Sequence, residues 1–178
     1  MTRFVSLFRG INVGGHKQVR MDELKALHAS LGFEDVATYI QSGNVVFTGE
    51  DGDTAHIQQR IEEAFAHTFG FSSNVIVRSA SELQQCIANN PFQNDPTKEP
   101  KWVIVLFLAS QPESAALEAL RQSYTGTEEF SLIGQELFIY YSNGVGRSKL
   151  TLPLIEKKLK TTGTGRNWNT VLQLQKMM

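Results

Sequence analysis

The sequence predicts an α+β fold with two subdomains that repeat nearly the same order of strands and helices. Short apolar runs typical of buried strands alternate with amphipathic helical stretches, and brief polar turns join consecutive strands. A proline-rich segment divides the chain near its middle. Because short turns can join only antiparallel strands, each subdomain is expected to contain an antiparallel sheet.

The first subdomain is predicted over residues 1–78, with the ferredoxin-like order β-α-β-β-α-β. Strands are expected over 3–8, 36–40, 45–48 and 75–77, and helices over 21–31 and from Asp53 or Thr54 to Phe69. Gly32 and Gly70 are expected to end these helices, since glycine readily adopts the left-handed conformation of a helix terminus. His28 lies one position from the leucine stripe of the first helix and is expected at its flank.

Residues 79–100 are predicted to form a short helix followed by a stiff connector. Ser79 and Glu82 have capping-box spacing at the start of that helix. Cys86, the only cysteine, lies on the helix, where a buried and unreactive thiol is expected. The connector holds three of the five prolines, which are Pro91, Pro96 and Pro100.

The second subdomain, residues 101–178, is predicted to have the order β-α-β-β-α with an additional C-terminal helix. The expected elements are a strand over 102–108, a helix opened by the segment 110–113, strands over 130–133 and 137–141, and a helix over about 152–160. The polar segment 161–167 is expected to be flexible, and Asn167 is expected to cap the last helix.

Charge is distributed unevenly, although the net charge of the 178 residues is only −1. Residues 1–21 contain four basic residues and no acid, and residues 142–178 contain seven basic residues and one acid. The apolar run at residues 4–8 is too short for a signal peptide or a membrane span, so a cytoplasmic location without membrane attachment is expected. With one cysteine and four scattered histidines, no metal or redox cofactor is expected.

The segment Arg9-Gly10-Ile11-Asn12-Val13-Gly14-Gly15 has the composition of a ligand-binding loop. Its glycines allow close backbone approach, and Arg9 carries a guanidinium suited to carboxylate or phosphate. The spacing matches neither the P-loop nor the dinucleotide fingerprint. The loop should lie beside the turn Gln41-Ser42-Gly43-Asn44, because strand 45–48 is expected to start where strand 3–8 ends.

Three signatures together resemble the bacterial family known as domain of unknown function 1697: the run from Leu7 to Gly15, the run from Thr38 to Phe47, and the run from Arg166 to Val171. Asn90-Pro91-Phe92 and the run from Gly146 to Leu150 also fit its pattern, so the resemblance spans nearly the whole chain. The chain departs from the pattern at Arg20, where many relatives have proline, and at Gly165, where a serine, threonine or alanine is usual. The resemblance implies two α+β subdomains and no established activity.

The leading functional hypothesis is the binding of a small anion, such as a nucleotide or a phosphorylated metabolite, in a cleft between the subdomains. RNA ranks below a small anion because no exposed aromatic RNA-recognition run is present and the sequence pI is about 6.4. An enzyme that uses Arg9 and Arg166 electrostatically, with His16 or Ser42 as the reacting group, is a second hypothesis, and a protein-interaction module is a third. The candidate ligand-binding residues are Arg9, Gly10, Asn12, Gly14, Gln41, Ser42, Asn44, Arg147, Lys149, Arg166, Asn167 and Asn169.

Overall fold

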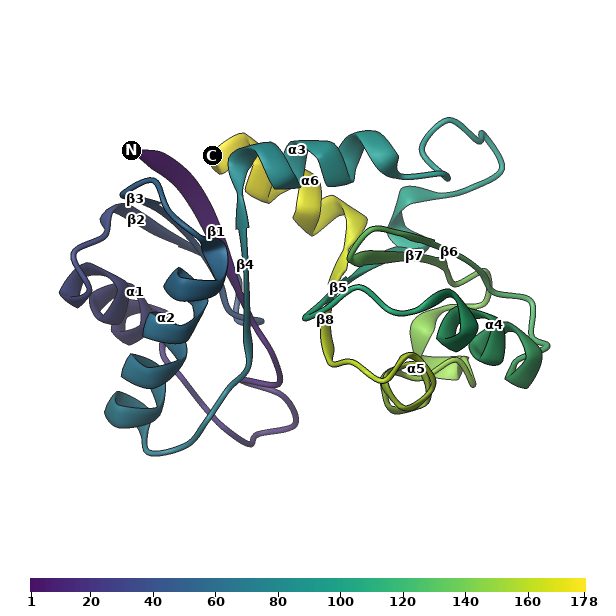
Figure 1. Ribbon diagram of the computed structural model, residues 1–178, viewed down its shortest axis with the longest axis horizontal. Helices are drawn as coiled ribbons and strands as arrows, with labels where there is room; N and C mark the ends of the chain where they lie inside the picture. The colour runs from purple at the N-terminus through teal and green to yellow at the C-terminus, as the bar shows by residue number, and fades with distance from the viewer. The chain divides into compact units, whose positions relative to one another are not determined.

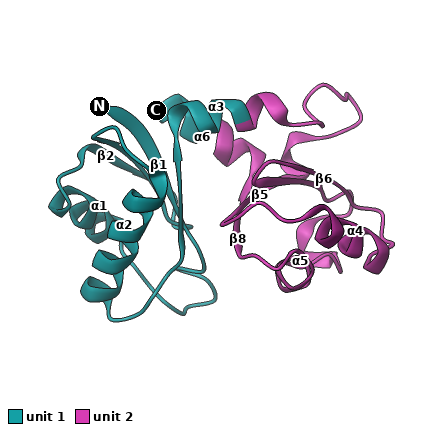
Figure 2. Ribbon diagram, in the orientation of Figure 1, with its two compact units in different colours: residues 1–85, 173–178 teal, residues 86–172 magenta.

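The computed structural model describes residues 1–178 and shows two compact α+β units (Figures 1 and 2). Unit 1 consists of residues 1–85 and 173–178, and unit 2 of residues 86–172. Each unit contains one four-stranded antiparallel sheet, so the predicted fold class is confirmed. The predicted boundaries, with a connector over residues 79–100 between the subdomains 1–78 and 101–178, stay a prediction.

Unit 1 follows the predicted β-α-β-β-α-β order, and its sheet has the strand order β2-β3-β1-β4. Its elements are β1 Thr2–Phe8, α1 Met21–Ser30, β2 Glu34–Tyr39, β3 Asn44–Gly49, α2 Thr54–Phe69 and β4 Val75–Ser79. The helices α1 and α2 cover one face of this sheet. Asp53 caps α2 by accepting the Ala55 N–H at 3.0 Å, and Gly70 ends the helix with φ 77°.

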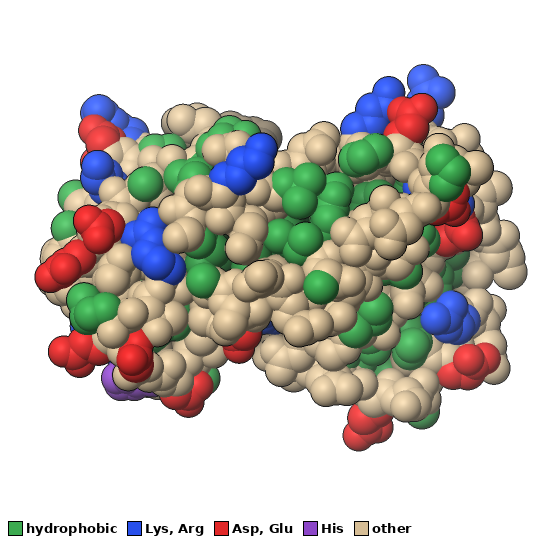
Figure 3. Space-filling model, turned by 90° about the horizontal axis from the view of Figure 1, so that it is seen from above, with side chains coloured by type: hydrophobic (Ala, Val, Ile, Leu, Met, Phe, Trp, Pro, Cys, Tyr) green, Lys and Arg blue, Asp and Glu red, His purple; other side chains and the backbone are tan.

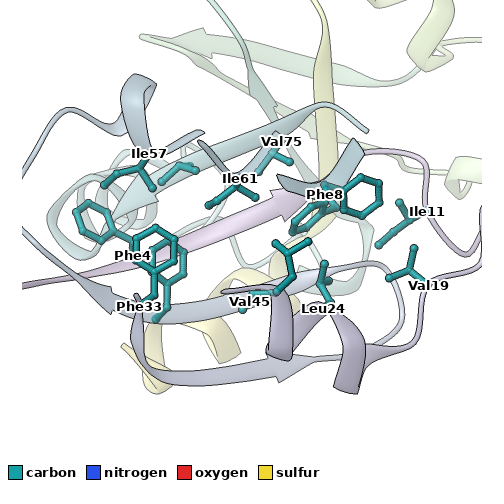
Figure 4. Packing of buried hydrophobic residues seen from close by; sticks show 14 residues of the cluster. Phe4, Phe8, Ile11, Val19, Leu24, Phe33, Val45, Ile57, Ile61 and Val75 are labelled. Atoms are coloured by element: carbon teal, nitrogen blue, oxygen red, sulfur yellow. The ribbon is translucent and has the colours of Figure 1, made fainter. Parts of the chain in front are cut away.

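The core of unit 1 is rich in aromatic side chains, which Figure 4 shows between the sheet and its two helices. Phe33 and Phe47 lie closest among the ring pairs, with centroids 4.4 Å apart. Ile11 and Val19 belong to the same cluster, although both lie outside the regular elements. The loop between β1 and α1 is therefore fixed to the core at two points.

Unit 2 has the same order of elements, and the strand order of its sheet, β6-β7-β5-β8, is equivalent to that of unit 1. Its elements are β5 Val103–Leu108, α4 Ser114–Ser123, β6 Glu129–Ile133, β7 Glu136–Tyr140, α5 Leu152–Leu159 and β8 Gly163–Asn167, with short 3₁₀ turns at Pro100–Trp102 and Val145–Arg147. Its core is mainly aliphatic and lies between the sheet and the helices α4 and α5.

Each final strand leads directly into a further helix, α3 at Ala80–Asn89 and α6 at Trp168–Met177. The predicted capping box of α3 is confirmed: Ser79 Oγ accepts the Glu82 N–H at 3.2 Å, and Glu82 Oε2 accepts the Ser79 N–H at 2.8 Å. Cys86 is buried in α3, as predicted. The last residues return to unit 1, where Arg3 donates to the Met177 carbonyl at 2.9 Å.

The two units also share one buried arginine at an equivalent strand position, which the order of elements in the sequence does not reveal. Arg78 in β4 and Arg166 in β8 occupy equivalent positions, each opposite a valine of the central strand. Both side chains are buried. Arg78 donates to the carbonyl of Val77 at 3.1 Å, and Arg166 donates to that of Gly165 at 2.9 Å. The two arginines thus share a local backbone contact as well as a register position.

The strand β8 corrects the prediction that residues 161–167 are flexible. Gly163 pairs with Leu108 and Asn167 with Ile104, which completes the second sheet. Two glycines in five residues weaken the strand signal, because glycine lacks the side chain that a strand packs. A Cβ on Gly163 would lie only 2.9 Å from the Phe107 carbonyl oxygen, so a glycine fits this edge where larger residues would not.

The start of α4 differs from the prediction that Ser110 opens the helix. The helix begins four residues later, at Ser114, and the Glu113 carbonyl accepts its first N–H bonds from Ala116 and Leu117. Pro112 favours an extended conformation at the residue before it, which keeps that residue out of the helix. The Ser110 hydroxyl instead donates to Thr161 Oγ1 at 2.8 Å.

His28 is not a flank residue, because its side chain is fully buried in α1. Its Nδ1 lies 2.8 Å from the Leu24 carbonyl oxygen, which can only accept, so Nδ1 carries the proton. Its Nε2 then accepts from Ser6 Oγ at 2.9 Å. Burial lowers the pKa of His28 to about 4, with the Leu24 carbonyl opposing the shift in part. Both ring nitrogens have hydrogen-bond partners inside the core, which explains why this polar side chain can be buried among apolar ones.

Candidate functional site

The glycine loop between β1 and α1 is a small hairpin with an exposed tip. The Asn12 N–H donates to the Lys17 carbonyl at 3.1 Å, and the His16 N–H donates to that of Val13 at 3.1 Å. Gly14 and Gly15 form the two-residue turn with φ values of 60° and 77°. Two consecutive positive φ angles are typical of a tight hairpin turn and favour glycine. The glycines therefore serve this turn and leave its backbone open to solvent.

Asn12 holds the base of the hairpin through three hydrogen bonds. Its Nδ2 donates to the carbonyls of Val19 at 3.0 Å and Gln41 at 2.8 Å, and its Oδ1 accepts the Val19 N–H at 2.7 Å. The same residue has a φ of 55°, which asparagine tolerates better than most residues. Because both ends of its amide are engaged within the protein, Asn12 would influence a ligand by positioning the loop.

The turn between β2 and β3 lies against this loop, as the predicted strand pairing requires. The Phe8 N–H donates to the Gly43 carbonyl at 2.9 Å. A Cβ on Gly43 would lie 2.5 Å from Ile11 Cδ1 and 2.9 Å from Phe8 Cβ, and its φ is 88°. Only glycine fits both the conformation and the close approach. Asn44 is buried and donates to the Tyr39 carbonyl at 2.8 Å and to Ser42 Oγ at 2.9 Å, which holds the turn.

Ile40, in the same turn, has a φ of 50° and an exposed side chain. A β-branched residue rarely adopts this conformation, since its Cβ substituents crowd the backbone. Strain of this kind costs on the order of 1–3 kcal/mol and is concentrated at functional sites. The turn is thus held in a conformation that its own side chain disfavours.

A cavity of about 680 Å³ opens where the loop, the turn and the start of α1 meet. It is lined by Asn12, Gly15, Gln18, Val19, Arg20, Met21, Asp22, Glu23 and Gln41. Asn12 and Gln41 were among the sequence-based candidates, and the other seven lining residues were not. Gly15 ends the glycine signature, Gln18 and Arg20 follow it closely, and arginine is unusual at position 20, so these are the signals that could have identified them.

The charges at this cavity are mixed, although the loop itself is basic. Arg20 Nη2 lies 2.9 Å from Asp22 Oδ2, and both side chains are exposed. An exposed ion pair of this kind contributes little stability. Asp22 and Glu23 lie in the first turn of α1, where a carboxylate interacts favourably with the helix dipole. On the face shown in Figure 3, basic and acidic side chains are interspersed, so any preference for anions must arise locally.

Arg9 and Gly10 lie in unit 1 but outside the cavity lining, and the Arg9 N–H donates to the Asn74 carbonyl at 3.0 Å. The remaining candidate residues belong to unit 2. Arg147 and Lys149 are exposed on the segment before α5. Arg166 is 6% exposed, donates to Thr164 Oγ1 at 2.7 Å, and has its pKa lowered to about 10 by burial. Asn167 caps α6, as predicted, by accepting the Asn169 N–H at 2.9 Å, and its Nδ2 donates to the Lys101 carbonyl at 2.8 Å. Ligand contacts by these residues stay predictions.

No group of three or more His, Cys, Asp or Glu side chains is arranged to hold a metal ion. His16 is exposed in the hairpin, and Ser42 accepts a hydrogen bond from Asn44 inside the turn. The structure does not include a helix that is both long and apolar enough to cross a membrane.

Comparisons with known proteins agree with the fold. No curated protein sequence matches the chain. Among solved structures, the conserved bacterial protein SP0830 from Streptococcus pneumoniae is similar, with a TM-score of 0.74 and 25% sequence identity. The match covers 99% of this chain and 98% of that one. The family described as "Protein of unknown function (DUF1697)" matches residues 1–138, which include the glycine loop and the turn that approaches it, and the chain therefore belongs to the DUF1697 family.

Proposed function

We propose that unit 1 binds a small anionic metabolite, such as a nucleotide or a sugar phosphate, at the cavity beside the hairpin 12–17. The observation that carries this proposal is the hairpin itself: Asn12 fixes its base by three hydrogen bonds, and the Gly14-Gly15 tip is exposed. A rigid, exposed backbone turn with positive φ angles offers N–H groups to an anion at little ordering cost.

Basic side chains next to this tip support the choice of an anion. Lys17 lies at the end of the hairpin, and Arg20 lines the cavity. Residues 1–21 contain no acid, and the only carboxylates among the lining residues are those of Asp22 and Glu23. An incoming phosphate would compete with Asp22 for the Arg20 guanidinium. Arginine binds phosphate through two parallel hydrogen bonds, which favours the ligand over a single exposed carboxylate contact.

The strain at Ile40 is a second support, independent of charge. Gln41, the next residue, lines the cavity, and its carbonyl accepts from Asn12. The surrounding structure holds this strained turn in place without a ligand. A turn that is fixed in this way, and that joins the loop at the cavity, is consistent with a preformed binding site. The cavity volume of about 680 Å³ also lies in the range of small-molecule sites.

The test is a calorimetric titration of the full chain with AMP, ribose 5-phosphate and pyrophosphate at low salt. We expect at least one of these anions to bind, and Arg20→Gln and Lys17→Gln each to weaken that binding about tenfold to a hundredfold, as the loss of a charge-assisted hydrogen bond would. Lys25→Gln, an exposed change on α1 outside the cavity, is the matched control. Binding that survives both loop substitutions, or no binding of any anion, would refute the proposal.

A further inference from the structure

A second cavity, with different chemistry, lies in unit 2 between its sheet and α5. Its volume is about 390 Å³. It is lined by Ile104, Leu106, Ile139, Tyr141, Val145, Leu150, Thr151, Leu152, Ile155 and Gly165. None of these residues is charged, and none belongs to the cavity of unit 1.

The cavity exists because β8 presents glycine toward the helices. Gly165 pairs with Leu106, whose side chain belongs to the core on the helix-covered face. The equivalent residue in unit 1 is Val77, which is itself part of the core of that unit. A Cβ on Gly165 would lie 3.3 Å from Ile104 Cγ2 and otherwise meet little. In unit 1 the Val77 side chain occupies this position, whereas in unit 2 the absence of a side chain on Gly165 leaves the corresponding space open.

The polar groups in the lining already have partners within unit 2. The Tyr141 hydroxyl donates to the Leu150 carbonyl at 2.9 Å. Burial raises the pKa of this tyrosine to about 12, so the hydroxyl keeps its proton at neutral pH. Thr151 Oγ1 caps α5 by accepting the Leu154 N–H at 3.4 Å. The part of any ligand that enters this space must therefore be apolar, because a polar group would lose its water without gaining a partner.

The segment at the opening is basic. Val145, 50% exposed, and Leu150, fully buried, both line the cavity. Arg147 and Lys149 lie between them in sequence and are exposed. Residues 142–155 contain no acid, and the next one, Glu156, accepts the Gly163 N–H at 3.0 Å. An apolar cavity with two exposed cations on a segment that contributes to its lining is complementary to an amphiphile with a negative headgroup.

We propose that unit 2 binds a single-chain alkyl anion, with its hydrocarbon chain in this cavity and its headgroup at Arg147 and Lys149. At roughly 30 Å³ for each methylene, the volume of about 390 Å³ would hold about thirteen, but the space opens to solvent beside the half-exposed Val145, so a chain of about ten carbons is the length that we expect to be enclosed. Each buried methylene should strengthen binding about fourfold until the cavity is full. This site is separate from the proposed anion site of unit 1, and neither depends on the other.

The test uses calorimetry on the full chain with hexanoate, octanoate, decanoate and dodecanoate, all below their micelle concentrations. We expect affinity to rise about sixteenfold for each two carbons added and to level off near decanoate. Decanol should bind more weakly than decanoate, and decyltrimethylammonium more weakly still, because Arg147 and Lys149 favour a negative headgroup. An affinity that does not change with chain length, or that does not depend on the headgroup charge, overturns the proposal.

Two kinds of variant locate the site. Lys149→Glu should weaken decanoate binding about tenfold, whereas Lys25→Glu, the same change in unit 1, should leave it unchanged. Val145→Trp should obstruct the opening, and Gln111→Trp adds the same ring at an exposed position outside the lining. Both tryptophan positions are exposed, so folding should be retained and can be checked by circular dichroism. Equal decanoate affinity in Val145→Trp and Gln111→Trp would show that the chain does not enter this cavity.

Discussion

The two units share one topology, but the cavity of unit 1 lies at a polar loop and the cavity of unit 2 lies beside its apolar core. In unit 1 the connection from the first strand to the first helix spans residues 9–20, whereas the equivalent connection in unit 2 spans only 109–113. The longer connection forms the hairpin and its polar cavity. In unit 2 the connection is short, and the space lies in the core beside β8. The comparison shows that loop length and edge-strand side chains, which leave the fold unchanged, determine where a cavity opens.

The cores differ in composition as well. The core of unit 1 includes several phenylalanines, whereas the core of unit 2 consists mainly of leucines and isoleucines. All four histidines lie in unit 1, and both tryptophans, Trp102 and Trp168, lie in unit 2. Histidine protonation and intrinsic tryptophan fluorescence therefore report on different units.

The largest expected effect is at the contact between the loop and the turn in unit 1. Gly43→Ala forces a Cβ against Ile11 and Phe8 at a left-handed φ, and we expect it to lower the free energy of unfolding by about 3–4 kcal/mol. Gly134→Ala, in a hairpin of unit 2 where φ is 61° and only the Glu136 carboxylate lies nearby, should cost about 1 kcal/mol. Urea unfolding measures both. Equal losses in the two variants would mean that the loop–turn contact is not specially tight.

A pH effect should distinguish the histidine of the unit 1 core. Because the pKa of His28 is about 4 when folded and near 6.5 when unfolded, the unfolded chain binds more protons between these values. Stability should be full above pH 6.5 and should fall by about 3 kcal/mol as the pH drops to 4. His28→Gln should remove this component of the slope, whereas His56→Gln, an exposed change on α2, should retain it. Urea midpoints across this pH range decide, and an unchanged slope in His28→Gln would contradict the prediction.

The two structural asparagines allow a comparison of intermediate size. Asn12 makes three hydrogen bonds in unit 1, and Asn167 makes two in unit 2. At about 1 kcal/mol for each hydrogen bond, Asn12→Ala should cost about 3 kcal/mol and Asn167→Ala about 2, both reduced where water replaces the lost partner. Alanine at the left-handed φ of residue 12 adds strain to the first variant only. Thermal unfolding at fixed pH measures the pair. A larger loss from Asn167→Ala would show that the hairpin base is less rigid than its hydrogen bonds suggest.

The smallest expected effect is a gain in stability. Ile40→Gly should relieve the left-handed strain and stabilise the protein by up to about 1 kcal/mol, after the greater flexibility of glycine in the unfolded chain is subtracted. Lys160→Gly, at the left-handed C-cap of α5 with φ 57°, should give a smaller gain because lysine is not β-branched. A loss of stability in Ile40→Gly would indicate that the isoleucine makes contacts that outweigh its strain.

The sequence predicted the parts of the fold that local chemistry controls. Helix ends lie where the capping residues predicted them, at Asp53, Gly70 and the Ser79–Glu82 pair. Capping depends only on residues within one turn of the helix end. The contact between the glycine loop and the turn at Gly43 was also predictable, because in a β-α-β-β-α-β unit the third strand pairs antiparallel with the first and therefore starts beside its end.

The sequence could not reveal features that depend on distant partners. β8 forms because β5 offers an open edge, which outweighs the poor strand propensity of two glycines. His28 is buried because Ser6, on another element, satisfies its second nitrogen. The candidate list included Asn12 and Asn44 as ligand contacts, but a side-chain amide has the same sequence signal whether it meets a ligand or a backbone carbonyl.

The fold class, the order of most elements and the position of the glycine loop could be predicted from residue patterns, because periodicity, caps and turns are encoded by residues close together in the chain. Which side chains are enclosed and which spaces remain open depends instead on how the folded segments pack together. The cavities at Arg20 and at Gly165 arise where segments far apart in sequence meet, and their volumes depend on how each neighbouring side chain packs. Packing of this kind is a property of the assembled core, which no local pattern of residues specifies.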